Sequence, residues 1–479
     1  MRRVTDAAEL DGLSRDAGPA TMVPKVAYFA STESEVVAAI REAEAAGLPV
    51  TPRGGGTGIP TQSVGRGALV IQTDSTAALS GELVTCGPGL VKADLNRYLV
   101  QGDRWLPVDP SSYASCTVGG MVANNSSGAR SLKYGSTIEY VSGLRVALPG
   151  GDAFTAAALP LGDAGSGDQK RQRAVALLTE NQKAIAEEAP RVTKNSSGYR
   201  LERVVHDGVL DFPRLFVGSE GTLGVTTQAT LRVVKRPSWR ALFVVDTSLA
   251  ALDHDVGAFR SLRPAALELV DKSVFRRVGR WDRVAPYSRS DDQYMLFCEL
   301  DGEGSQGEAM ERAGSSQVAG LEPMALSDPA DVQSAWEVRN ETLSLALEIR
   351  DGPRSLAPGV EDLVVPPDKL GELVRLLTGQ FESRGLGYIL YGHAGDANLH
   401  ARPLVDGSGQ EGKGTMRELM DECFERVWKM GGSMTGEHGD GMLRAGYVER
   451  QYPRTYWIMK EIKAIFDPKM VMNPGVKLA

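Results

Sequence analysis

The residues best suited to chemistry lie in two short motifs in the last quarter of the sequence. Three of the five histidines fall in them: His393 and His400 in GHAGDANLH, and His438 in GEHGDG, where Glu437 directly precedes it. Two imidazoles and a carboxylate can bind a divalent metal and leave a coordination position open, and these donors suit zinc, manganese or iron(II). Histidines at such a spacing also cap loops or satisfy buried polar groups, so the pattern by itself leaves both interpretations open.

A second group of motifs is rich in glycine and small polar residues. The first, RGGGTG over residues 53–58, offers backbone N–H groups that could surround a phosphate. It is not a Rossmann fingerprint, because Ile59 stands where a glycine is required, and no Gly-Lys-Ser/Thr follows as in a P-loop. Segments 109–137 and 217–231 repeat this composition. One such loop fits a tight turn, whereas three of them indicate a surface that lies along a polar ligand.

Composition and charge narrow the class of protein. The chain has 479 residues, of which 42% are hydrophobic and 24% charged, values typical of a soluble globular protein. The net charge of −8 disfavours a nucleic-acid partner. The sequence shows no apolar run long enough for a transmembrane segment, no apolar signal-peptide core and no CxxC pair. We therefore expect a cytoplasmic protein that has no disulfide framework and no iron–sulfur site of its own.

The hydrophobic pattern predicts the elements that position these motifs. Thr32 and Glu35 fit a capping box at the start of a helix, Gly47 fits its end, and the strand LPVTP then leads into RGGGTG. Short strands and glycine-rich loops follow as far as Pro237. The texture beyond it is that of an α+β domain with an antiparallel sheet. The predicted parts are an N-terminal ligand-binding domain over 1–237, a cap over 238–430 and a C-terminal return over 431–479.

Taken together, the motifs resemble a known family. PRGGGTG, PSSYASCTVGGMVANNSSG, KYGST and GSEGTLGVTTQATL are similar to the flavin-binding half of FAD-linked oxidases of the vanillyl-alcohol-oxidase type. YGHAGDANLH and GEHGDGMLR resemble the D-2-hydroxyacid dehydrogenase branch, which includes D-lactate dehydrogenase, the glycolate oxidase large subunit and D-2-hydroxyglutarate dehydrogenase. The resemblance implies an α+β fold: an FAD-binding domain of two subdomains (PCMH type) and an α+β cap, the substrate domain, with an antiparallel sheet.

The resemblance also implies how FAD is bound. Backbone amides of the first loop and hydroxyls of the second would hold the pyrophosphate, and GSEGTLGV would line the adenine and ribose. Relatives that attach flavin through the first loop carry a histidine where Thr57 stands, so we expect non-covalent FAD. The expected cofactor-binding residues are Pro52, Arg53, Gly54, Gly55, Gly56, Thr57, Gly58, Pro110, Ser111, Ser115, Thr117, Gly119, Gly120, Asn124, Ser126, Ser127, Gly128, Tyr134, Gly135, Glu220, Gly221, Gly224, Val225 and Asn473.

For the histidine motifs the resemblance implies oxidation of a D-2-hydroxy acid to the 2-oxo acid. A metal held by His393, His400 and Glu437 would bind the substrate hydroxyl and carboxylate. His438 would remove the hydroxyl proton, and hydride would pass from the substrate Cα to flavin N5.

Recognition of the substrate carboxylate requires a fixed cation. Arg339 in WEVR resembles the family's carboxylate-binding arginine, since a planar guanidinium fits a carboxylate. A dicarboxylate would require a second cation, for which Arg354 and Arg444 are candidates, and Asn398 could orient the substrate or a ligand. Arg339 and Arg354 could instead be ion-pair partners at the surface.

One departure from the family pattern bears on the electron acceptor. Many D-lactate and glycolate relatives read GEHGIG, whereas this chain reads GEHGDGMLR, which resembles a branch often fused to an iron–sulfur domain. No cysteine cluster follows, so we expect a separate iron–sulfur subunit, an electron-transfer flavoprotein, quinone or oxygen as acceptor; an oligomer is compatible with the sequence. Two alternatives remain: an oxidase of another alcohol that uses oxygen, and a catalytically silent flavin-binding subunit of a larger complex.

Overall fold

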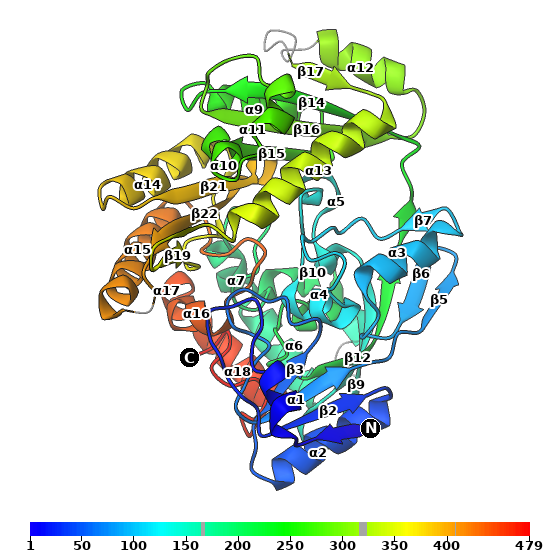
Figure 1. Cartoon of the computed structure of the whole chain (residues 1–479). Helices are drawn as coiled ribbons and strands as arrows, with labels where there is room; N and C mark the ends of the chain where they lie inside the picture. Colours follow the sequence, from blue (N-terminus) through cyan, green and yellow to red (C-terminus); the bar gives the residue numbers. More distant parts are fainter. Residues whose placement is uncertain (164–167, 316–322, 408) are drawn as a thin grey trace.

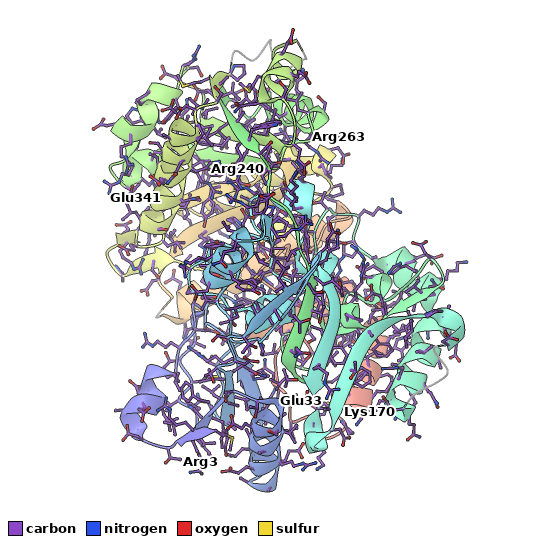
Figure 2. All side chains as sticks on the ribbon, turned by 90° about the vertical axis from the view of Figure 1, so that its right-hand side faces the viewer. Arg3, Glu33, Lys170, Arg240, Arg263 and Glu341 are labelled. Carbon is purple, nitrogen blue, oxygen red and sulfur yellow. The ribbon has the colours of Figure 1, made fainter. Side chains whose placement is uncertain are left out.

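The chain forms an N-terminal domain with two main sheets and a cap built on one large antiparallel sheet (Figure 1). The structure is a computed structural model, which describes residues 1–163, 168–315, 323–407 and 409–479. None of the helices in these ranges combines the length and the apolar character needed to span a bilayer. Figure 2 shows the two domains from the side, with Arg3, Glu33 and Lys170 labelled in the N-terminal domain and Arg240, Arg263 and Glu341 in the cap.

The first sheet carries the RGGGTG loop. Its strand order is β1–β2–β4–β3, and β2, β4 and β3 run parallel. The bounds are β1 Arg2–Val4, β2 Val26–Ala30, β3 Val50–Arg53 and β4 Ala68–Gln72. The loop therefore begins at the carboxyl end of β3, which is the edge at which open parallel sheets bind ligands.

Helix α2, Glu33–Ala45, covers one face of this sheet, as the hydrophobic pattern predicts. The Thr32 hydroxyl accepts a hydrogen bond from the Glu35 N–H at 3.3 Å, and Gly47 has a φ of +65° after the helix end. The capping box differs in one detail. The Glu35 carboxylate accepts from the Ser31 N–H at 2.8 Å, so it satisfies the residue before the cap.

The second sheet is antiparallel, in the order β10–β11–β9–β8–β12–β6–β5. Its strands are β5 Ala77–Ser80, β6 Leu83–Cys86, β8 Val141–Ala147, β9 Ala153–Pro160, β10 Val205–His206, β11 Val209–Asp211 and β12 Val225–Arg232. The side chains of β12 alternate between buried and more exposed positions, as the sequence predicts for a half-buried strand. The short helix α4, Val118–Asn124, packs against β12, whereas α5, Ser131–Tyr134, lies higher up, beside β15 of the cap (Figure 1).

The cap sheet runs β17–β14–β16–β15–β21–β22–β19–β18, with β20 also paired to β22. Its bounds are β14 Trp239–Thr247, β15 Ala266–Asp271, β16 Tyr294–Gly302, β17 Met324–Leu326, β18 Arg350–Asp351, β19 Arg354–Leu356, β20 Leu363–Val364, β21 Tyr388–His393 and β22 Asn398–Val405. Helix α13, Pro329–Ala346, packs on one face, and α9, Leu252–Ser261, with α14, Leu370–Glu382, packs on the other. These findings confirm the α+β fold with an antiparallel cap sheet.

Helix α5 joins the two domains through charged side chains. Arg130, just before α5, donates to both Glu299 oxygens at 2.7 and 2.8 Å and to Asp109 Oδ2 at 2.7 Å. Lys133 and Tyr134 both donate to Asp301 of the cap. Because several of these groups are buried, separating the cap from the N-terminal domain here would leave buried charges without their partners.

After α15, Gln410–Lys429, the chain returns to the N-terminal domain, where α18, Tyr456–Phe466, packs beside α6, Gln169–Glu180. Met472 pairs with Val50 at the edge of the first sheet. Lys477 then enters the interior with no exposed surface. Its ammonium lies 2.8 Å from Asp440 Oδ2 and 3.0 Å from Glu220 Oε1, so one cation neutralises two buried carboxylates.

Removing this cation should destabilise the fold. We expect Lys477→Met to lower the free energy of unfolding by about 3–5 kcal/mol, because two carboxylates would stay buried without their cation. Lys469→Met is the matched control, because Lys469 is exposed and forms only a loose ion pair, 3.6 Å from Glu44 Oε2. Urea unfolding followed by tryptophan fluorescence measures both changes. Equal unfolding midpoints for the two variants would contradict this role of Lys477.

Candidate active site

The three glycine-rich loops line one elongated cavity in the N-terminal domain. Most of the predicted cofactor-binding residues lie in its wall: Pro52, Arg53, Gly54, Gly55, Gly56, Thr57, Gly58, Pro110, Ser111, Thr117, Gly119, Gly120, Asn124, Ser126, Ser127, Glu220, Gly221, Gly224 and Val225. The wall also includes residues that were not among the expected cofactor-binding residues: Gln62, Gln72 and Phe216 outside the motifs, and Ser219 within GSEGTLGV. We call this space the first cavity.

The first cavity is suited to an anion because its loops approach each other closely at glycines and leave backbone N–H groups unpaired. A Cβ on Gly54 would lie 2.5 Å from Thr117 Oγ1, and one on Gly55 would lie 2.2 Å from the Ser115 carbonyl oxygen. Within the described ranges, the N–H groups of residues 55–58 donate to no protein acceptor. Unpaired donors in a glycine-rich turn at a sheet edge are the arrangement that binds a pyrophosphate.

The other predicted cofactor-binding residues lie outside that wall. Asn473 is buried behind it and donates to the backbone oxygens of Gln62 and Glu220 at 2.9 and 2.7 Å, so it supports two of the loops. Tyr134 lies at the contact with the cap, where its hydroxyl bonds to Asp301, and Gly135 follows it. Gly128 lines a second cavity, and Ser115 packs against Gly55 through its carbonyl.

The second cavity lies between the N-terminal domain and the cap. Arg339, His393 and His400 of the cap line it, together with Glu437 and His438 of the C-terminal return. Glu437 and His438 also line the first cavity, so the GEHGDG loop stands where the two spaces meet.

The predicted metal ligands converge on one point. Glu437 Oε1 lies 3.1 Å from His393 Nε2 and 3.1 Å from His400 Nε2, and the two nitrogens are 3.2 Å apart. Ligand atoms of a tetrahedral zinc ion, at about 2.0–2.1 Å from the metal, lie about 3.3 Å from one another. The three donor atoms are therefore spaced as the ligands of one small cation.

Each of these side chains is held from its other end. His393 Nδ1 bonds to Glu268 Oε1 at 2.7 Å, and His400 Nδ1 bonds to the Glu361 carbonyl oxygen at 2.9 Å. Glu437 Oε2 accepts from Lys194 Nζ at 3.0 Å and from the Ser127 hydroxyl at 2.8 Å, which leaves Oε1 for the histidines. Partners of this kind orient the ligands of metal sites.

Proton positions make the fit to a cation more specific. The Glu361 carbonyl can only accept, so His400 carries its hydrogen on Nδ1 and directs the Nε2 lone pair at Glu437 Oε1. Burial lowers the pKa of His400 and keeps it neutral. For His393, burial opposes the charge, but Glu268 outweighs it and raises the pKa to about 9. Thus the site attracts positive charge, as a proton on His393 or as a metal.

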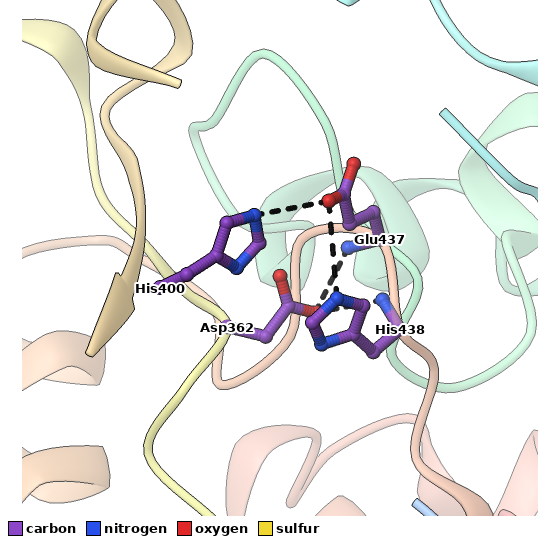
Figure 3. A group of neighbouring side chains, drawn as sticks. All are labelled: Asp362, His400, Glu437 and His438. Carbon is purple, nitrogen blue, oxygen red and sulfur yellow. Dashed lines mark hydrogen bonds and ion pairs between the residues drawn. The ribbon is translucent and has the colours of Figure 1, made fainter. Parts of the chain in front are cut away.

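A different set of possible ligands shares two of these residues. Asp362, His400, Glu437 and His438 have ligand atoms within 4.8 Å of one another (Figure 3). Asp362 Oδ2, however, already accepts from the Glu437 N–H at 3.0 Å, the His438 N–H at 2.8 Å and the Thr435 hydroxyl at 2.5 Å. Asp362 is therefore committed to holding the loop, and His393 is the better third ligand.

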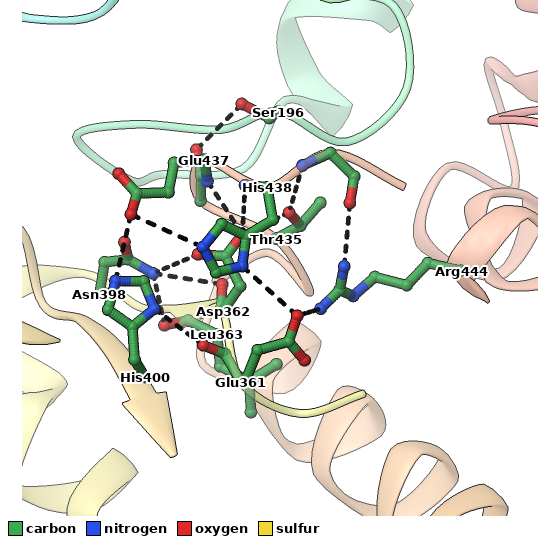
Figure 4. A network of polar contacts seen from close by, with 12 residues as sticks. Ser196, Glu361, Asp362, Leu363, Asn398, His400, Thr435, Glu437, His438 and Arg444 are labelled. Atoms are coloured by element: carbon green, nitrogen blue, oxygen red, sulfur yellow. Dashed lines mark hydrogen bonds and ion pairs between the residues drawn. The ribbon is translucent and has the colours of Figure 1, made fainter. Parts of the chain in front are cut away.

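His438 is oriented by carboxylates. Its Nδ1 lies 3.4 Å from Glu361 Oε1, which also binds Arg444 at 2.7 Å, and its Nε2 lies 3.9 Å from Glu437 Oε1 (Figure 4). The ring stacks on His400 with centroids 5.0 Å apart. Burial disfavours the charged ring, but Asp362 and Glu361 raise the pKa of His438. The imidazole is thus well suited to accept a proton at Nε2, beside the proposed ligands.

The remaining predicted site residues take different positions. Arg339 pairs with Glu268 and donates to Asn340 Oδ1 at 3.0 Å. Asn398 is fully buried and donates to Asp362 Oδ1 at 3.0 Å, so it supports the loop through Asp362, while its Oδ1 accepts no hydrogen bond in the described ranges. Arg354 is exposed on β19 and is not among the residues that line either cavity. Arg444 is fully buried against Glu361.

Sequence reasoning missed the side chains that surround these motifs. Lys194, Glu268 and Asp362 orient the proposed ligands from segments far away in sequence. A local signal existed for two of them: Glu268 interrupts the apolar strand AALELV, and Asp362 follows Glu361 just before the apolar LVVP. A charge inside an apolar run is unusual unless it has a buried partner.

Comparisons with known proteins agree with this organisation. Residues 24–157 match the "FAD binding domain" and residues 238–476 match "FAD linked oxidases, C-terminal domain". The chain is 30% identical to the D-lactate dehydrogenase of Archaeoglobus fulgidus, over 93% of this chain and 89% of that protein. It is 28% identical to the glycolate oxidase subunit GlcD of Bacillus subtilis, over 90% and 84%.

Two further comparisons concern a longer relative and a solved structure. The D-2-hydroxyglutarate dehydrogenase of Escherichia coli is 27% identical over 97% of this chain, which spans only 49% of that longer protein. A solved alkyldihydroxyacetonephosphate synthase has the same fold, with a TM-score of 0.68 at 16% identity, over 98% of this chain and 82% of the other. On these grounds the chain belongs to the family of FAD-linked oxidases, within its D-2-hydroxyacid dehydrogenase branch.

Proposed function

We propose that this protein is an FAD-dependent dehydrogenase that oxidises a D-2-hydroxy acid to the 2-oxo acid. One observation carries the proposal: the loop with Glu437 and His438 lines both cavities. A flavin in the first cavity and a substrate in the second would meet at this loop. The names of the similar proteins, D-lactate dehydrogenase and D-2-hydroxyglutarate dehydrogenase, support the same class of substrate.

The first cavity fits FAD by its donors. A pyrophosphate needs hydrogen-bond donors, and the unpaired N–H groups of residues 55–58 can supply them. Thr117, Ser126 and Ser127, which carry hydroxyls, line the same wall. Thr57 cannot form the histidyl bond of covalent relatives, so the proposed FAD is non-covalent. When bound, FAD would supply the hydride acceptor.

We propose that His393, His400 and Glu437 hold one divalent cation, of zinc, manganese or iron(II). The spacing of the three donor atoms and the buried partners behind each of them support this assignment. When bound, the cation would fix the substrate hydroxyl and carboxylate and lower the pKa of the hydroxyl.

Two side chains of the second cavity would then perform proton transfer and carboxylate binding. His438 accepts the hydroxyl proton at Nε2, since its Nδ1 faces Glu361. Arg339 lines the cavity and pairs with Glu268 through one guanidinium nitrogen, while its buried Nε donates to no protein acceptor in the described ranges, which supports a role in binding the substrate carboxylate. Electrons would leave the flavin to a separate iron–sulfur subunit, an electron-transfer flavoprotein or quinone, and we place the protein in the cytoplasm.

The substrate class is tested by anaerobic titration of the purified flavoprotein. We expect D-2-hydroxy acids to bleach the oxidised flavin spectrum and their L-enantiomers to leave it unchanged, because hydride must leave one face of Cα. The measurement is the absorbance of the flavin after each addition, with buffer alone as the control. A flavin that no D-2-hydroxy acid reduces would overturn the proposal.

The metal is tested by substitution of a ligand. We expect His400→Asn to lower the bound divalent metal from near one per chain to a small fraction, because one of three ligands is lost. Elemental analysis of the purified protein measures this directly. His254→Asn is the control, since His254 is exposed on α9. Wild-type protein that keeps its activity after a chelator has removed every divalent ion would contradict the assignment.

The base is tested at constant flavin content. We expect His438→Gln to reduce the rate of flavin reduction by about 10²–10⁴-fold, the range that general-base groups contribute, while the flavin absorbance per chain is retained. His254→Gln should match the wild type. Unchanged reduction in the His438 variant would exclude His438 as the base.

A further inference from the structure

An arginine in the second cavity has no role in the mechanism above. Arg402 lies on β22, two residues beyond His400, and both side chains line the cavity. Leu399 and Ala401 point to the other face of the strand, into the main hydrophobic core. Because side chains alternate along a strand, Arg402 stands beside His400 on the same face, about 6.7 Å further along.

Among the described residues, the guanidinium of Arg402 has no carboxylate within ion-pair distance, although its charge helps, after that of Arg444, to hold the pKa of the buried Glu361 below its usual value. Within the described ranges this guanidinium forms no hydrogen bond and no ion pair, and its buried Nε lacks an acceptor. Several other arginines line this cavity; among them, Arg130 binds Glu299 and Asp109, and Arg339 has an ion pair with Glu268. A half-buried, unpaired guanidinium in a cavity is unfavourable unless an anion completes it.

The residue is also placed apart from the proposed reaction centre. Glu437 Oε1, on which the proposed ligands converge, lies next to His400. Arg402 lies two residues further along the same face of β22, away from that point. A substrate whose hydroxyl end lies at His400 would therefore reach Arg402 only with a group at the far end of its carbon chain. The same cavity is also lined by Tyr391, whose hydroxyl interacts electrostatically with Arg402, and by Asn340 and Leu343 of α13.

We infer that Arg402 binds a second carboxylate, at the far end of the substrate, and so selects dicarboxylic D-2-hydroxy acids over monocarboxylic ones. This inference rests on the proposed function and specifies its substrate class. It also replaces the two cations suggested by sequence, because Arg354 is exposed and Arg444 is buried against Glu361.

The test compares two acids that share the reacting end. D-malate and D-lactate differ by one carboxylate, so stopped-flow reduction of the bound flavin under anaerobic conditions can separate recognition of that group from chemistry. We expect Arg402→Gln to raise the half-saturating D-malate concentration by about 10- to 100-fold, the effect of losing a charged hydrogen bond, and to leave D-lactate unchanged. Arg402→Lys should restore part of the affinity for D-malate.

Arg354→Gln serves as the matched control, and thermal melting of each variant verifies folding. The inference is overturned if wild-type protein uses D-lactate as well as it uses D-malate and D-2-hydroxyglutarate, or if Arg402→Gln weakens D-lactate and D-malate equally. These results leave the proposed function intact, because hydroxy acids still reduce the flavin. If no D-2-hydroxy acid reduces the wild-type flavin, the proposed function itself fails and the inference with it.

Discussion

The arrangement of the site depends on one buried carboxylate, that of Asp362. It has no exposed surface, and it accepts the N–H groups of Glu437 and His438 together with the Thr435 hydroxyl and the Asn398 amide. Hydrogen bonds to an ionised acceptor are about twice as strong as neutral ones, and here several act on one short loop. The loop can therefore hold Glu437 and His438 in fixed positions even though it belongs to no helix or strand.

Around this carboxylate, charge is balanced pair by pair. Lys194 faces Glu437, Arg444 faces Glu361, Arg339 faces Glu268, and Lys477 faces Asp440 and Glu220. Buried pairs of this kind contribute little net stability, since desolvation offsets their attraction. What they provide is a unique arrangement, because any shift of one partner would leave a charge without its counterpart. Arg402 lines the second cavity without a carboxylate at ion-pair distance among the described residues, and its charge acts on Glu361 from further away.

Much of this organisation was predictable from local sequence, and the limits have physical causes. The helix from Glu33 and the glycine-rich loops have short-range signatures, and both lie where the patterns predict. A tight turn between β21 and β22 brings His393 close to His400, whereas Glu437 reaches them through the remote contacts of its loop with Asp362. Partners contributed by remote segments, such as Glu268 and Lys194, leave almost no local trace.

The positions of single side chains also depend on contacts that are remote in sequence. Tyr134 lies in the motif KYGST, yet the contact with Asp301 turns it to the cap, and only the three-dimensional arrangement shows this. Arg354 looks like a binding cation in sequence, but it falls on the exposed side of the β18–β19 turn. Conversely, Arg402 gives no signal in the motif, and its place depends on the strand alternation that begins at His400.

The return of the chain to the N-terminal domain has a consequence for biosynthesis. The wall of the first cavity is supported by Glu220, whose carboxylate is completed by the N–H groups of Asp440 and Gly441 and by the Lys477 ammonium. During translation these groups emerge after the whole cap. The domain whose synthesis begins first is therefore completed last, because the carboxylate of Glu220 gains its cation and two of its N–H donors only when the C-terminal return has been made.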